Sequence, residues 1–91
     1  MEIKMKFVEP IIELANLCTA NKVPFTLNIC HDGMQMRFPW CVGDVVCHSA
    51  SYGSYDECVE TFRFPWDDDD VTSLIPEEAA IRIADYHHHT V

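Results

Sequence analysis

Four consecutive aspartates, Asp67 to Asp70, are the residues of this chain whose type and spacing most clearly suggest chemistry. Carboxylates bind hard cations such as Ca²⁺, but a calcium loop places them at alternate positions around a glycine, and this run contains no glycine. Adjacent carboxylates also point in different directions. We therefore expect no metal site here and interpret the run either as a solvated loop or as a surface for a basic partner.

Soft metal ligands are also present, because the chain contains five cysteines and five histidines. Those that a predicted hairpin and its next strand would bring near one another are Cys30, His31, Cys41, Cys47 and His48. Structural zinc sites usually use ligand pairs about two to four residues apart, whereas the chain has neither Cys-x-x-Cys nor His-x-x-x-His. Cys47 and His48 would point to opposite faces of a strand. We therefore predict no metal, no cofactor, and reduced, partly buried thiols.

A turn at Tyr52, Gly53 and Ser54 offers backbone N–H groups and hydroxyls that could receive a phosphate. It lacks a lysine and the Walker spacing, and Asp56 and Glu57 would oppose an anion. No Gly-rich oxyanion turn accompanies any of the thiols. The sequence therefore predicts no catalytic residues, and we expect the protein not to be an enzyme.

Charge is distributed unevenly along the chain. The net charge is −9; residues 49–91 hold ten acids against two bases, whereas residues 1–48 hold five against four. Such a negative field repels nucleic acid and anionic membrane and favours a basic partner surface. Composition is 48% hydrophobic, with no apolar run of about 18 residues and no secretory signal pattern. We expect a single domain, 1–91, that is cytoplasmic and either a monomer or a small homo-oligomer.

Helical spacing marks the first element. Between about Lys6 and Ala20, apolar residues recur every three or four positions: Phe7, Ile11, Leu14, Leu17 and Cys18. The spacing predicts an amphipathic helix with Pro10 in its first turn and Asn21 as a left-handed terminator.

A β-hairpin is the strongest local signal. Two alternating stretches flank Asp32-Gly33, a pair typical of a two-residue type I′ turn. The resulting register places apolar residues opposite one another on the buried side, Ile29 with Met36 and Leu27 with Phe38. A third strand at Val45–Ala50 would complete a three-stranded meander.

Two helices are expected after the meander. Ser54 and Glu57 have the spacing of a capping box, which predicts a helix from Ser54 to about Arg63. The segment Phe64–Asp70 is expected to be a loop, and Pro76 to begin a final helix. The predicted fold class is therefore α+β, with an N-terminal helix, a three-stranded antiparallel β-meander and two C-terminal helices.

One tetrapeptide occurs twice, as Arg37-Phe38-Pro39-Trp40 and Arg63-Phe64-Pro65-Trp66. The elements predicted around the two copies differ, so duplication of a unit is not expected. We interpret them as two tryptophans that each plug one end of the core.

A resemblance to known proteins is carried by Gly43-Asp44-Val45-Val46-Cys47-His48-Ser49-Ala50-Ser51-Tyr52-Gly53, Glu57, Asp67-Asp68-Asp69-Asp70-Val71 and Pro76-Glu77-Glu78-Ala79-Ala80. These stretches look like small uncharacterised proteins carried by phages and prophages of gut Firmicutes, a group that implies no activity. In size, acidity and predicted element order the chain is also similar to some phage anti-CRISPR proteins, which present carboxylates in the DNA-binding channel of a nuclease. The second likeness is architectural only.

These observations lead to one functional hypothesis and an alternative. The hypothesis is a non-enzymatic phage-type accessory or inhibitor protein that binds a basic surface of a host protein through an acidic patch, as an anti-CRISPR-like nucleic-acid mimic, without direct contact to nucleic acid or membrane. The predicted partner-binding residues are Asp56, Glu57, Glu60, Asp67, Asp68, Asp69, Asp70, Glu77 and Glu78. The alternative is a nucleotide-binding or sequestering protein that uses Tyr52, Gly53 and Ser54, with Trp40, Trp66 or Tyr86 as stacking walls.

Overall fold

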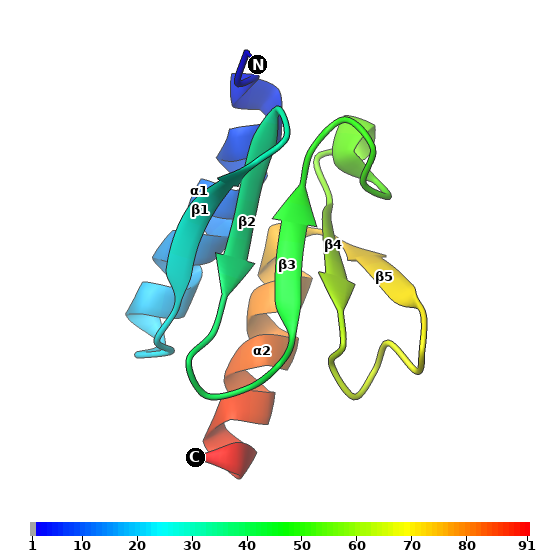
Figure 1. Ribbon diagram of the computed structural model, residues 1–91. Coiled ribbons are helices and arrows are strands. Elements are labelled where there is room, and N and C mark those ends of the chain that lie inside the picture. The colour runs from blue at the N-terminus through cyan, green and yellow to red at the C-terminus, as the bar shows by residue number, and fades with distance from the viewer. Residues whose placement is uncertain (1) are drawn as a thin grey trace.

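The chain folds into a five-stranded antiparallel sheet with two helices on one face (Figure 1). The structure, a computed structural model, describes residues 2–91. The elements in chain order are α1 (Met5–Ala20), β1 (Thr26–Cys30), β2 (Gly33–Arg37), β3 (Asp44–Cys47), the short 3₁₀ helix η1 (Ser54–Asp56), β4 (Val59–Phe62), β5 (Val71–Leu74) and α2 (Pro76–Thr90). The strands follow one another across the sheet in sequence order, so each connection is a hairpin or a short link.

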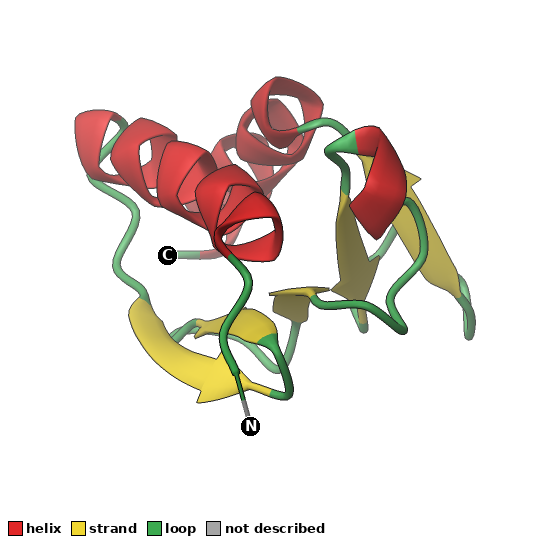
Figure 2. Cartoon of the chain, turned by 90° about the horizontal axis from the view of Figure 1, so that it is seen from above, coloured by secondary structure: helices red, strands yellow, loops and turns green. Residues whose placement is uncertain are grey.

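The core lies between the sheet and the helices. Figure 2 shows both helices on the same side of the sheet, and among residues 2–91 no helix lies over the opposite face. The buried residues come from both helices and the central strands and include Phe7, Ile11, Leu14, Met36, Val45, Val59, Ala79 and Ile83. Within residues 2–91, no helix has the length and apolar character needed to cross a membrane.

The predicted first helix is confirmed, with differences at both of its special positions. Pro10 lies inside α1 rather than in its first turn, and its side chain is buried. Asn21 has φ −95°, so it is not left-handed; Lys22, with φ 59°, takes that conformation instead. The Asn21 side-chain amide donates to the carbonyl of Leu17 at 2.8 Å and so satisfies one of the free carbonyls at the helix end.

The hairpin is present, but its turn is displaced by one residue. His31 and Asp32 form the loop, so Leu27 pairs with Met36 and Ile29 with Met34. The displacement moves every partner by two positions and therefore leaves each side chain on its predicted face. Met36 is buried, whereas Ile29 on the edge strand is 68% exposed.

Gly33 explains why the turn is displaced. It lies within β2, where a Cβ atom would collide with the backbone carbonyl of Cys47 on β3. His31 adopts the left-handed backbone with φ 55°, and Gly33 does not. Asp32 fixes the turn because its Oδ1 accepts the backbone N–H of Ser49 at 2.9 Å, a contact that lowers the pKa of this carboxyl.

The predicted fold class is wrong in its strand and helix content. The third strand is confirmed but runs from Asp44 to Cys47. The predicted helix after it is absent; η1 is followed by β4, and β5 then precedes a single C-terminal helix, α2. Two left-handed residues, Gly53 with φ 77° and Glu57 with φ 62°, flank η1 and prevent a longer helix.

Periodicity alone could not distinguish a helix from a strand in the segment Ser54–Phe62. Tyr55, Cys58, Val59 and Phe62 fit a helical period, but alternate residues of the same segment fit a strand. Val59 and Thr61 are fully buried against the core, whereas Glu60 and Phe62 face away.

Candidate partner-binding surface

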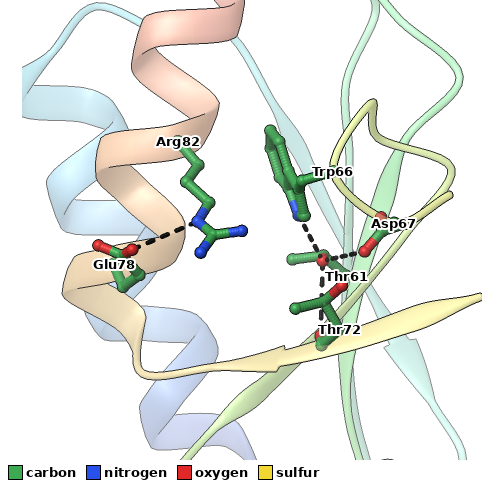
Figure 3. Close-up of polar contacts among 6 residues, drawn as sticks. All are labelled: Thr61, Trp66, Asp67, Thr72, Glu78 and Arg82. Carbon is green, nitrogen blue, oxygen red and sulfur yellow. Dashed lines mark hydrogen bonds and ion pairs between the residues drawn. The ribbon is translucent and has the colours of Figure 1, made fainter.

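The structure separates the first aspartate of the acidic run from the other three. Asp67 is only 5% exposed. Its Oδ1 accepts the hydroxyl of Thr61 at 2.8 Å, and its Oδ2 accepts the backbone N–H of Phe64 at 3.0 Å. Figure 3 shows Thr61 at the centre of this network, where it also accepts the indole N–H of Trp66 at 2.9 Å. Asp67 therefore anchors the β4–β5 connection from inside and does not face a partner.

Asp68, Asp69 and Asp70 form an exposed acidic turn between β4 and β5. Asp68 and Asp69 have left-handed backbones, with φ 47° and 69°. The acidic turn borders a hollow of about 430 Å³ whose walls include Val42 and Phe62. Val42 is 75% exposed and Phe62 36% exposed, so apolar surface lies beside the carboxylates.

The remaining predicted residues lie away from the acidic turn. Asp56 and Glu57 belong to the β3–β4 connection, at the other end of β4 (Figure 1). Glu60 lies on the sheet face that no helix covers, where its carboxylate accepts the backbone N–H of Tyr52 at 3.3 Å. Glu78 on α2 is half-buried, and its carboxylate lies 3.3 Å from Nε of Arg82. The nine predicted residues therefore do not form one continuous patch.

Two of the nine predicted residues, Glu57 and Glu77, lie beside a glutamate that the sequence did not single out. Glu13 on α1 lies beside Glu77 and Glu57, and we call these three residues the glutamate cluster. Burial, and then the negative charges of Glu77 and Glu57, raise the pKa of the Glu13 carboxyl. Nothing in the sequence indicates which residues from other elements lie next to Glu13 on α1.

The alternative ligand site is not assembled in the structure. Tyr52 is 69% exposed, whereas Ser54 is buried and its hydroxyl donates to the carbonyl of Ser51 at 3.1 Å. Both belong to the β3–β4 connection. Trp40 and Trp66 lie in the connections at the opposite end of the sheet (Figure 1), so they cannot provide stacking walls for this turn.

Both copies of the repeated tetrapeptide meet in one aromatic cluster. Phe64 stacks on Trp66 with 4.6 Å between ring centroids and lies edge-on to Phe38 at 5.7 Å. Tyr86 on α2 lies 5.6 Å from Trp40 and 6.4 Å from Trp66. The two tryptophans therefore cover the same end of the core, and the prediction that each plugs a different end is wrong.

The five soft metal ligands considered above are divided by the sheet. Cys30, His31 and His48 lie together, with one ligand atom from each within 4.8 Å of the others. Cys47 is fully buried on the core side, and Cys41 is half-buried in the β2–β3 connection. All five cysteines are free thiols, and burial raises the pKa of Cys18 and of Cys47 to about 11. Both buried thiols are therefore protonated at neutral pH and poor nucleophiles.

Comparisons of the chain with protein-family models, with curated proteins and with solved structures found no match. The residues and their geometry are therefore the only basis for assigning a function.

Proposed function

We propose that this is a non-enzymatic phage-type accessory protein whose acidic turn binds a basic surface of a host protein in the cytoplasm. The observation that carries the proposal is that three exposed carboxylates project from a turn whose first residue, Asp67, is buried and fully hydrogen-bonded. A turn whose backbone is anchored in this way loses less conformational entropy on binding than an unanchored acidic loop would.

Apolar surface beside the acidic turn supports the same function. Val42 and Phe62 are exposed next to the carboxylates, and interfaces commonly combine an apolar centre with a charged rim. The carboxylates would accelerate association and set specificity, while Val42 and Phe62 would contribute buried apolar area. The proposed partner surface therefore has lysine or arginine side chains around an apolar contact.

Nucleic-acid mimicry follows from the same chemistry. Carboxylates on an anchored turn can occupy lysine and arginine sites that otherwise bind phosphates, and the polyanion is then displaced. The proposed class of partner is therefore a host protein whose basic surface binds nucleic acid.

The test uses the immobilised protein to capture partners from host lysate at low and high salt. One variant, Asp68→Asn/Asp69→Asn/Asp70→Asn, neutralises the acidic turn and preserves its shape, because asparagine tolerates the left-handed backbone. The matched control, Glu13→Gln/Glu57→Gln/Glu77→Gln, also removes three negative charges, but from the glutamate cluster. Circular dichroism checks that both variants fold.

We expect the parent and the glutamate-cluster variant to retain the same protein, and the acidic-turn variant to lose it. Nucleic acid added to the lysate should compete for this protein. Equal loss in both variants would show that only net charge matters. Binding by the acidic-turn variant that matches the parent at physiological salt would eliminate the acidic turn as the binding surface.

A further inference from the structure

Three potential zinc ligands converge at the end of the sheet where α1 begins. Cys30 is the last residue of β1, His31 begins the following turn, and His48 directly follows β3. One ligand atom from each lies within 4.8 Å of the other two. Ligand atoms around a tetrahedral zinc ion are about 3.5 Å apart, because the bonds are about 2.0–2.3 Å long. Small side-chain movements are therefore enough to close these three residues on one ion.

Gly33 explains why two of these ligands approach one another across the sheet. It pairs with Cys30 across β1 and β2, and it lies next to the backbone of His48 on the other side. Because Gly33 has no Cβ atom, β2 lies close to the β3 backbone at Cys47 and His48, which brings His48 nearer to Cys30. His31 completes the group from the turn, with its ring centroid 4.8 Å from that of His48.

Strand alternation assigns Cys47 and His48 to different sides of the sheet. Cys47 points into the core and is fully buried, so it cannot join the group. His48 points the other way and meets Cys30 instead. A search for ligand pairs close in sequence misses this arrangement, because the ligands come from a strand end, a turn and the end of a second strand.

We propose that Cys30, His31 and His48 bind one zinc ion, with three protein ligands and an open fourth position. A thiolate and two neutral imidazoles are donors that zinc prefers. The Cys30 thiol releases its proton to solvent when the zinc–sulfur bond forms. Nδ1 of His48 accepts the backbone N–H of Ala50 at 3.1 Å, and this hydrogen bond must open when the ring binds the ion.

The surroundings leave the fourth position accessible. Both histidines line an open hollow of about 370 Å³, together with three charged side chains: Glu2, Lys4 and Asp32. Glu2 and Asp32 favour a cation, whereas Lys4 opposes it. A solvent-exposed ion with an open position is the arrangement of zinc sites that bind water or an exogenous ligand. This zinc site lies at the opposite end of the sheet from the acidic turn, so the two proposals can fail independently (Figure 1).

The test is calorimetric titration of reduced protein with zinc chloride. Exposed histidines at the end of α2 could also bind zinc, so the parent for this series carries His88→Ala/His89→Ala. Three variants each remove one ligand: Cys30→Ser, His31→Asn and His48→Gln. Asparagine at position 31 preserves the left-handed turn. Cys41→Ser is the matched control, because Cys41 is another half-buried free thiol outside the site.

We expect the parent and Cys41→Ser to bind one zinc ion with equal affinity. Loss of a residue that supports a zinc ligand typically weakens metal binding by about 10–100-fold. Loss of a direct ligand should weaken zinc binding at least as much. Cobalt(II) should give a thiolate-to-metal charge-transfer band in the parent that Cys30→Ser lacks. Zinc affinity that does not change in Cys30→Ser would overturn the proposal. So would the absence of zinc binding in the His88→Ala/His89→Ala parent when the unsubstituted protein binds zinc. If one variant does not fold, the other two and the cobalt spectrum decide.

Discussion

The β2–β3 and β4–β5 connections both contain the Phe-Pro-Trp of the repeated Arg-Phe-Pro-Trp and lie at the same end of the sheet (Figure 1); Arg37 is the last residue of β2, whereas Arg63 directly follows β4. The two copies are 26 residues apart, and the same offset places β2 on β4 and β3 within one residue of β5. Each copy therefore lies at the end of the first strand of a hairpin, at an equivalent position. Their phenylalanines and tryptophans belong to the same aromatic cluster.

The copies differ from the tryptophan onward. The Trp40 indole N–H donates away from its hairpin, to the carbonyl of Pro24 at 3.0 Å. The Trp66 indole N–H donates within its own hairpin, to Thr61. Cys41 follows the first tryptophan, whereas Asp67 follows the second and closes the turn by accepting the Phe64 N–H. The comparison shows that an identical tetrapeptide does not fix a turn, because the hydrogen bonds of the two copies depend on residues outside the tetrapeptide: Pro24 for the first, and Thr61 and Asp67 for the second.

The largest difference between the copies should appear when their phenylalanines are truncated. Phe64 is 3% exposed and contacts the rings of Phe38, Trp66 and Tyr86. Phe64→Ala should lower the free energy of unfolding by about 3–5 kcal/mol, as for other buried aromatic residues. Phe38→Ala should cost less, because its ring has contacts with fewer aromatic partners. Urea denaturation measures both, and a larger loss for Phe38→Ala would contradict this ranking.

The residues that follow the tryptophans provide the next contrast. Asp67→Asn should cost about 1–3 kcal/mol, because the amide oxygen can still accept the Phe64 N–H but the amide nitrogen cannot accept the Thr61 hydroxyl, which must turn to the more distant carbonyl of Thr72 at 3.5 Å. Cys41→Ser, at the equivalent position, should cost under about 1 kcal/mol, because Cys41 is half-buried and makes no comparable side-chain hydrogen bond. Equal costs in urea denaturation would show that Asp67 does not anchor its turn.

Local patterns predicted the parts of the fold that depend on nearby residues. The periodicity of α1, the strong hairpin pattern and the proline and glutamates at the start of α2 each act within a few residues, and those elements are confirmed. The segment from Ser54 to Phe62 was assigned incorrectly because its apolar residues fit two periods, and the choice between them depends on pairing with β3 and β5.

The candidate site could be predicted only as a list of charges. The sequence identifies Asp67 to Asp70 as equally acidic, but burial of Asp67 depends on Thr61 and on the turn that encloses it. The zinc ligands were visible as residue types. Their convergence required the displaced turn at His31 and the absence of a side chain at Gly33, which are consequences of strand pairing.

Gly43 links the two connections and offers a third test. A Cβ atom at this position would lie 2.6 Å from ring atoms of Phe64, which is held against Trp66. Gly43→Ala should therefore cost about 1–2 kcal/mol through overpacking. The double variant Gly43→Ala/Phe64→Leu should recover part of this loss, because the smaller side chain leaves space for the methyl group. Additive losses in a double-mutant cycle would show that the two connections are not coupled here.

The smallest effect concerns Asp69, which occupies the position equivalent to Gly43. Its φ of 69° is a conformation that costs residues with a Cβ atom about 1 kcal/mol or more. Asp69→Gly should therefore stabilise the protein by up to about 1 kcal/mol, because glycine adopts this backbone without that penalty and the exposed carboxylate makes no contact that offsets it. Asp70→Gly is the control: Asp70 does not have a positive φ, and its Oδ1 accepts the N–H of Val71 at 2.8 Å. Asp70→Gly should therefore lower the urea midpoint, whereas Asp69→Gly should raise it. If both variants shift the midpoint in the same direction, the left-handed backbone at Asp69 is not what distinguishes the second connection from the first.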